Sequence, residues 1–175
     1  MPALETPRLL LRPLQEHDLD DYAAIMADPE VVQYLGTAPM TRDEAWRHMA
    51  LMLGHERLRG WSNNAVVDKA SDRLLGRCGL WQPEGWPGLE VGWVLGRAAW
   101  GQGFATEAAT AWRDWAFANL DVDELVSVIH RDNDRSKRVA ERIGHHHVRD
   151  LEIMGHPCLL YGQPRPRASR AKRHG

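Results

Sequence analysis

The sequence predicts a mixed α/β domain of the α+β class, with a central, mostly antiparallel sheet of about six to seven strands flanked by about four helices. Three strand-like runs between residues 61 and 95 are separated by short turns, which favours antiparallel neighbours. A helical period follows and leads to another strand-like run near residue 124. A strand, a helix and a strand in that order predict one parallel β-α-β crossover.

The part of the chain before residue 60 is expected to form one strand and two helices. Asp28-Pro29 breaks the chain between the helices, and Thr41 with Glu44 three residues later has the spacing of a capping box. Apolar residues recur along one face of the second helix, which indicates that it packs on the sheet. The expected elements are a strand over 8–14, closed by Pro13, and helices over 18–26 and 41–59.

The rest of the chain is expected to supply the remaining strands and two further helices. The third helix carries Trp112 and Trp115 on one apolar stripe, so both are expected in the core. Gly144 ends the fourth helix, and Pro164 with Pro166 ends regular structure. The expected strands span 61–67, 74–81, 89–95, 124–129 and 152–161, and the expected helices span 103–119 and 134–143.

Length and charge favour one domain over residues 1–162, followed by a basic, flexible tail over 163–175. The chain has 175 residues, 43% of them hydrophobic, and a net charge of −2. Five positive charges follow Tyr161, so the rest of the chain carries −7. An acidic body argues against a broad nucleic-acid-binding face. The basic residues of the tail are Arg165, Arg167, Arg170, Lys172 and Arg173.

Cys78 and Cys158 are too few for a disulfide framework and lack the paired spacing of a zinc site, which suits buried free thiols in the cytoplasm. Residues 1–14 lack the long apolar run of a signal peptide or a membrane span. Residues 145–147 are three adjacent histidines, and in an extended chain only His145 and His147 could point to the same face. Because metal ligands must converge, we expect no metal here. The sequence does not distinguish a monomer from a homodimer.

Gly101 and Gly103 lie where a strand leads into a helix, and such a turn can bind an anion with the unpaired N–H groups of the helix. A pyrophosphate-bearing cofactor is the expected ligand. One alternative is that the glycines only permit a tight turn. Another is a dinucleotide-binding fold with Asp132 on the ribose, but Thr106 replaces the third small residue and the glycines fall in mid-chain.

Three linked motifs follow one another along the chain. They are Glu-Val-Gly-Trp-Val-Leu from Glu90, Arg-x-x-Trp-Gly-Gln-Gly-Phe-Ala-Thr-Glu-Ala from Arg97, and Asn-x-x-Ser-x-Arg-Val-x-Glu-x-x-Gly from Asn133. Together they resemble the GNAT acetyltransferase superfamily. An opening Glu-Thr-Pro-Arg-Leu-x-Leu-Arg-Pro from Glu5 is typical of the ribosomal-protein-alanine N-acetyltransferase branch. The resemblance covers residues 6–162 and implies a GNAT-like fold.

The resemblance implies acetyl-CoA as the acyl donor. Backbone N–H groups over 102–106 are then expected on the pyrophosphate, and Asn133 on the pantetheine amides, while Trp100 departs from the usual first residue of the loop. Lys137 and Arg138 either reach the phosphates or form a solvated helix face. The expected cofactor-binding residues are Trp93, Val94, Leu95, Trp100, Gly101, Gln102, Gly103, Phe104, Ala105, Thr106 and Asn133.

Glu90 and Ser136 are the expected catalytic residues. Glu90 could take the proton of the amine, or it could bind an ammonium group or simply end a strand in solvent. Gly92 is well placed for a bulge, after which the N–H of Trp93 or Val94 could hydrogen-bond the thioester oxygen. Ser136 stands in for the Tyr that many superfamily members use as the acid, or it caps the helix.

Tyr34 and Trp81, with Trp86, are expected to line the acceptor pocket. The predicted function is direct acetyl transfer to a primary amine, either a protein N-terminal α-amine or a small-molecule amine, because no Cys lies on the motif segments. A binding domain that senses acyl-CoA is the alternative, favoured by the missing Tyr and by His145 where the family often has Phe.

Overall fold

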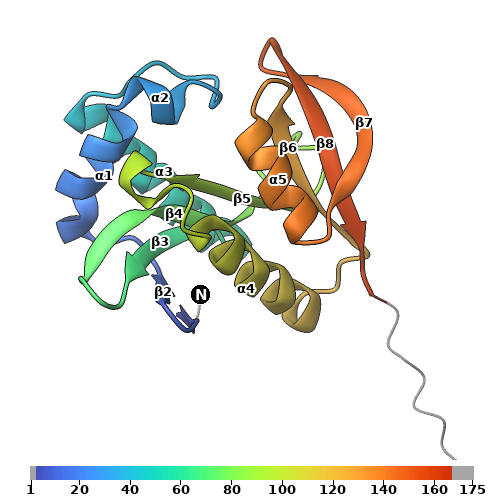
Figure 1. The fold of residues 1–175 in the computed structure, drawn as a ribbon, viewed down its shortest axis with the longest axis horizontal. Helices are drawn as coiled ribbons and strands as arrows, with labels where there is room; N and C mark the ends of the chain where they lie inside the picture. The colour runs from blue at the N-terminus through green and yellow to red at the C-terminus, as the bar shows by residue number, and fades with distance from the viewer. Residues whose placement is uncertain (1–2, 167–175) are drawn as a thin grey trace, which may run out of the picture.

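Eight strands form one sheet in the order β1-β2-β3-β4-β5-β6-β8-β7 in the computed structural model, which describes residues 3–166 (Figure 1). All neighbours are antiparallel except β5 and β6. The strands are β1 Leu4–Glu5, β2 Leu9–Arg12, β3 Asn63–Asp68, β4 Arg73–Trp81, β5 Glu90–Leu95, β6 Glu124–His130, β7 His146–Ile153 and β8 His156–Pro164. The helices are α1 Leu19–Met26, α2 Pro29–Val32, α3 Arg42–Arg59, α4 Phe104–Asn119 and α5 Asp134–Arg142, with 3-10 turns η1 Glu16–Asp18 and η2 Arg97–Ala99.

The predicted fold class is confirmed, including the parallel crossover from β5 through α4 to β6. Two apolar cores cover the two faces of the sheet. Val66 points to the core that contains α4, and its neighbours Ala65 and Val67 point to the core that contains α1 and α3. Trp112 of α4 is fully buried, as expected, and Trp115 of the same helix is partly buried and packs against the same core.

Three elements escaped prediction: the two-residue strand β1, the helix α2 and the strand β7. Asp28 and Pro29, expected to break the chain, instead begin α2, with Asp28 as the N-cap and Pro29 in the first turn. The single strand predicted over 152–161 is wrong, because this range spans the turn between β7 and β8, which form a hairpin. Its turn has positive φ at Met154 and Gly155, as a type I′ turn requires.

The final strand also extends beyond its predicted end at Tyr161, reaching Pro164. The side chain of Arg165 then donates hydrogen bonds to the carbonyls of Val122 and Phe117, at 2.9 and 2.8 Å. The start of the predicted tail therefore binds back near the end of α4. The remainder of that tail, 167–175, lies outside the described residues.

The bulge expected at Gly92 is wrong. The register between β4 and β5 runs without a shift from Gly76 opposite Leu95 to Trp81 opposite Glu90. The irregularity lies instead between β3 and β4, beside Gly76. A Cβ on Gly76 would lie 2.2 Å from the carbonyl oxygen of Val94, so only glycine fits there.

Over residues 3–166 no helix is both long and apolar enough to cross a membrane.

Candidate active site

The parallel strands β5 and β6 separate almost as soon as they meet. Their only register pair is Glu90 opposite Val126. Beyond it, side chains bridge the two strands: the Ser127 hydroxyl donates to the Val91 carbonyl at 2.7 Å, and the Val128 N–H donates to Oε1 of Glu90 at 3.2 Å. The sheet therefore opens at the carboxyl end of β5, where crossover folds commonly bind ligands.

Glu90 lies at the point where the strands separate. Its side chain is buried, with 8% of the residue exposed, so the alternative of a strand end in solvent is wrong. Trp86 Nε1 donates to its Oε2 at 2.7 Å. Burial raises the pKa of Glu90 to about 7, although hydrogen bonds from Val128 and Trp86 act in the opposite direction. A carboxyl group with this pKa can exchange a proton near neutral pH.

A cavity of about 490 Å³ lies over Glu90, between the α1–α3 segment and the strands β4, β5, β6 and β8. The structure brings the expected acceptor residues Tyr34, Trp81 and Trp86 together with Glu90 in its lining. Cys158 also lines this cavity, a position that no sequence motif predicted. Burial raises the pKa of the Cys158 thiol, so the thiol is protonated at neutral pH.

A second cavity, of about 340 Å³, lies at the carboxyl end of β5, next to the start of α4. Its lining includes all the residues predicted for cofactor binding except Gln102. It meets the first cavity along a shared wall. The residues that line both cavities are Tyr34, Leu35, Trp93, Val94, Asn133 and Ser136.

The turn before α4 presents helix N–H groups to the second cavity. Gly103, the N-cap, has a φ of 82°, and its residue type offers no side chain to cap the helix. Gly101 has a φ of 74°, and a Cβ there would meet nothing within 4 Å, so the left-handed backbone rather than crowding favours glycine. The N–H groups of Phe104, Ala105 and Thr106 lie in the uncapped first turn and suit an anion.

Three arginines of α5 add positive charge to this cavity: Arg135, Arg138 and Arg142. The Arg135 guanidinium stacks on the ring of Trp100, 3.7 Å from its centroid. Lys137, which the sequence suggested beside Arg138, instead pairs with Asp134 at 2.9 Å. The spacing of three and four residues places the arginines on one helix face, a signal that the sequence already contained.

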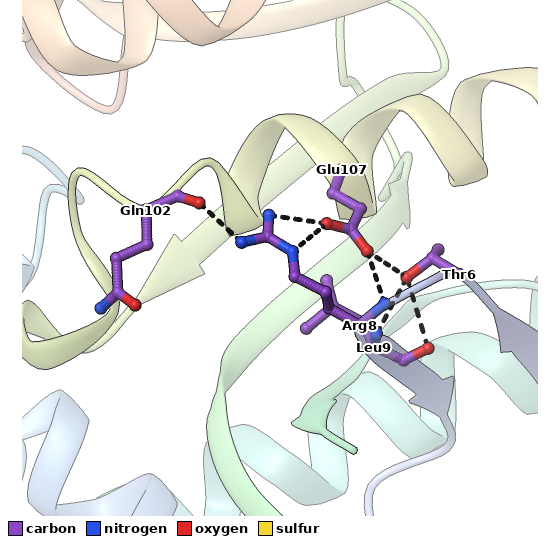
Figure 2. A network of polar contacts seen from close by, with 5 residues as sticks. All are labelled: Thr6, Arg8, Leu9, Gln102 and Glu107. Atoms are coloured by element: carbon purple, nitrogen blue, oxygen red, sulfur yellow. Dashed lines mark hydrogen bonds and ion pairs between the residues drawn. The ribbon is translucent and has the colours of Figure 1, made fainter. Parts of the chain in front are cut away.

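Residues of the N-terminal segment contact the turn and the first turn of α4 (Figure 2). Arg8 donates to the Gln102 carbonyl at 2.9 Å, and its Nε donates to Glu107 in the first turn of α4 at 2.7 Å. The Thr6 hydroxyl donates to the same Glu107 carboxylate at 2.6 Å. Gln102, whose N–H the sequence placed among the cofactor ligands, also anchors the loop through its carbonyl. The sequence did not predict this network, because Thr6 and Arg8 lie far from Glu107 along the chain.

Asn133 and Ser136 lie at the wall between the cavities. Asn133 is the N-cap of α5, because its Oδ1 accepts the N–H of Ser136 at 3.1 Å. The alternative that Ser136 caps the helix is therefore wrong, because the cap is Asn133. The amide nitrogen of Asn133 can still donate a hydrogen bond to a ligand. Ser136 Oγ accepts from Trp93 Nε1 at 3.3 Å, which leaves the hydroxyl proton for another acceptor.

His145, where the family often has Phe, is fully buried behind the opening. Its Nδ1 lies 3.2 Å from Ser127 Oγ, whose proton goes to Val91, so we infer that Nδ1 carries the hydrogen. Burial lowers the pKa of His145 to about 4. His147 instead contacts Asp150. Within residues 3–166 no three His, Cys, Asp or Glu side chains are grouped to hold a metal.

Comparisons with known proteins identify relatives and structural neighbours of this chain. The chain is 33% identical over 135 residues to p20, an uncharacterised N-acetyltransferase of Bacillus licheniformis, with 76% of each protein covered. An acetyltransferase crystal structure from Agrobacterium tumefaciens has a TM-score of 0.83 at 32% identity, covering 93% of this chain and 94% of that one. Spermidine N-acetyltransferase from Vibrio cholerae, solved with CoA and spermine, shares the fold at 18% identity, with a TM-score of 0.75 and coverage of 91% and 97%.

A family model for the acetyltransferase (GNAT) domain matches residues 8–146, which include β2 to β6, both cavities' shared wall and Glu90. The matched segment is most of the chain. The protein therefore belongs to the GNAT family and is an acetyltransferase.

Proposed function

We propose that the protein uses acetyl-CoA to acetylate a primary amine directly, either a protein N-terminal α-amine or a small-molecule amine. One observation supports this most strongly: the uncapped start of α4 and the buried carboxyl group of Glu90 face two cavities that share a wall. The CoA complex of the Vibrio cholerae neighbour supports the choice of donor. The motif from Glu5 to Pro13 is typical of the ribosomal-protein-alanine N-acetyltransferase branch. It therefore supports including a protein N-terminal α-amine among the proposed acceptors.

The residues of the second cavity fit CoA. The uncapped N–H groups over 104–106 and the guanidinium groups of Arg138 and Arg142 would bind its phosphates. The amide of Asn133 and the open edge of β5 would bind the pantetheine amides. Bound acetyl-CoA would supply an activated acetyl group as a thioester.

Trp93 is the better donor for the thioester oxygen of the two candidates in β5. The Val91 carbonyl faces β6, since Ser127 donates to it. Backbone groups of alternate residues point to the same edge of a strand, so the Trp93 N–H faces the opening while the Val94 N–H faces β4. A fixed N–H donor at this place would stabilise negative charge as it develops on oxygen.

Glu90 would take the amine proton, directly or through water, because its pKa of about 7 allows it to be ionised near neutrality. Ser136, whose hydroxyl is oriented by Trp93, would hydrogen-bond the departing thiolate and relay to it a proton from water, so that the hydroxyl regains its own proton. Tyr34 lines the same wall and is a second possible donor. The protonated thiol of Cys158 is a poor nucleophile, which favours direct transfer over an acetylated enzyme. The free thiols of Cys78 and Cys158 also suit a cytoplasmic protein.

The test is to titrate the protein with acetyl-CoA and then to measure free thiol and acetylated product with a panel of amines and N-terminal peptides. We expect saturable binding and amine-dependent release of thiol, with one acetylated amine for each thiol. Binding without acetylation of any acceptor would support an acyl-CoA sensor instead. Failure to bind CoA would contradict both functions.

A further inference from the structure

The acceptor cavity contains a second charged group, Arg77, in addition to Glu90. Arg77 and Trp81 lie four residues apart on β4, and Trp81 is directly opposite Glu90 on β5. Side chains of residues separated by an even number point to the same face of a strand. Arg77 and Glu90 therefore share one face of the sheet, and both line the same cavity.

Arg77 has no carboxylate partner within 4.0 Å among residues 3–166. Its Nε is buried and lacks a hydrogen-bond partner. The Tyr22 hydroxyl contacts His48 Nδ1 at 2.9 Å, and burial with the Arg77 charge lowers the pKa of His48 to about 4. The carboxyl group that feels the Arg77 charge is Glu90, at the other end of the cavity floor, and that charge acts to lower its pKa. A partly buried cation without a carboxylate in contact is costly unless a ligand supplies one.

The sheet surface between the two charges is made of small residues and one unsatisfied amide. Gly79 lies directly opposite Gly92, and Asn63 lies opposite Gly79 on the third strand. Asn63 is only 4% exposed, lines the cavity, and its Oδ1 has no hydrogen-bond partner. The floor of the cavity thus offers a hydrogen-bond acceptor midway between a cation and a carboxylate.

We propose that the acceptor is a small primary amine that also carries a carboxylate, an amino-acid-like molecule. Its amine would lie at Glu90 and its carboxylate on the Arg77 guanidinium, and an acceptor with an additional N–H group between them could donate it to Asn63. Glu90 is the only acidic residue among those described in the cavity lining, so a polyamine would find one carboxylate and a repelling cation. This inference rests on the proposed function and specifies its acceptor.

Paired acceptors isolate the carboxylate. Glycine, β-alanine, γ-aminobutyrate and ε-aminohexanoate are each compared with their neutral amides, and kcat/KM is measured by thiol release. We expect at least one acid to exceed its amide by about tenfold or more, as a charge-assisted hydrogen bond allows. Arg77→Gln should reduce this ratio toward one, and Arg77→Lys should retain part of it because the charge remains.

Arg73→Gln is the matched control, because Arg73 is an exposed arginine on the same strand and does not line the cavity. Its acid-to-amide ratio should equal that of the wild type. Thermal melting and CoA titration of Arg77→Gln establish that this variant is folded. Equal rates for acids and amides in the wild type, or a ratio that Arg77→Gln leaves unchanged, would overturn the proposal, as would a clear preference for polyamines or N-terminal peptides.

Binding separates this inference from the proposed function. Calorimetry on the CoA-loaded protein measures the affinity for the preferred acid and for its amide without requiring turnover. If no amine is acetylated, the proposed function fails, while tighter binding of the acid that depends on Arg77 still supports an anion site. If amines are acetylated but the acid binds no better than its amide, the acceptor assignment alone fails.

Discussion

Glu90 is both part of the sheet and part of the site. Its carboxylate accepts the Val128 N–H, which would otherwise have no partner where the two parallel strands separate. The same burial that makes this bond necessary also raises the pKa of Glu90 to about 7. The residue therefore stabilises the opening when it accepts that hydrogen bond, and it destabilises the fold when it must ionise there.

Glu90→Gln should change the pH dependence of stability. Because the folded pKa of about 7 exceeds the ordinary 4.5, the wild type should lose up to about 3 kcal/mol relative to the variant as pH rises from 4.5 through 7. Below pH 4.5 both the folded and the unfolded carboxyl groups are protonated, so this difference vanishes.

Urea unfolding of both proteins at pH 5 and pH 8 measures this effect. Glutamine also alters the hydrogen bond from Trp86, but it does so at both pH values. Subtracting the stability difference at pH 5 from that at pH 8 therefore removes this contribution. Parallel stability curves for the two proteins would show that Glu90 has an ordinary pKa.

At the scale of elements, the start of α4 depends on a segment far away in the sequence. Arg8→Ala would remove the hydrogen bond to the Gln102 carbonyl and the ion pair with Glu107 (Figure 2). Since the loop must then be ordered by the ligand, we expect the dissociation constant for CoA to rise about three- to tenfold, with a larger effect on KM for acetyl-CoA than on kcat.

Arg47→Ala is the control for this prediction, because Arg47 makes an exposed ion pair with Asp43 on α3, away from the loop. It should leave the affinity for CoA at the wild-type value. An Arg8→Ala protein that binds CoA as tightly as the wild type would show that the network only stabilises the fold.

The glycines of the helices should respond in opposite directions to alanine. Gly103→Ala requires a side chain at a φ of 82° and should cost about 1–2 kcal/mol of stability, with weaker CoA binding. Gly54 lies inside α3, where a Cβ meets nothing within 4 Å, so Gly54→Ala should add about 0.5–1 kcal/mol. Chemical denaturation with CoA titration checks both, and a neutral Gly103→Ala would contradict the role of the left-handed turn.

At the scale of the whole molecule, local patterns predicted most elements but not the edge of the sheet. The strand β7 consists almost entirely of exposed residues, so it lacks the alternation that marks a half-buried strand. Its turn uses Met154 where a type I′ turn usually has Asn or Asp. The helix α2 has only four residues, too few for a periodic pattern.

The candidate site divides in the same way. Residues contiguous in a motif, such as those of the glycine turn, could be located from sequence because neighbours in sequence stay neighbours in space. Arg77 and Asn63 could not, because their relation to Glu90 depends on the register of three antiparallel strands. His145 and Ser127 meet through tertiary packing, which a single sequence does not specify.

The central claim is that Glu90, buried where β5 and β6 separate, accepts the amine proton during acetyl transfer. The most direct measurement is the pH dependence of kcat/KM for the preferred amine in the wild type and in Glu90→Gln. We expect the wild-type rate to rise with pH through about 7, and the variant to lose that step together with about a hundredfold or more in rate. An unchanged pH profile in Glu90→Gln, at a rate close to that of the wild type, would contradict the claim.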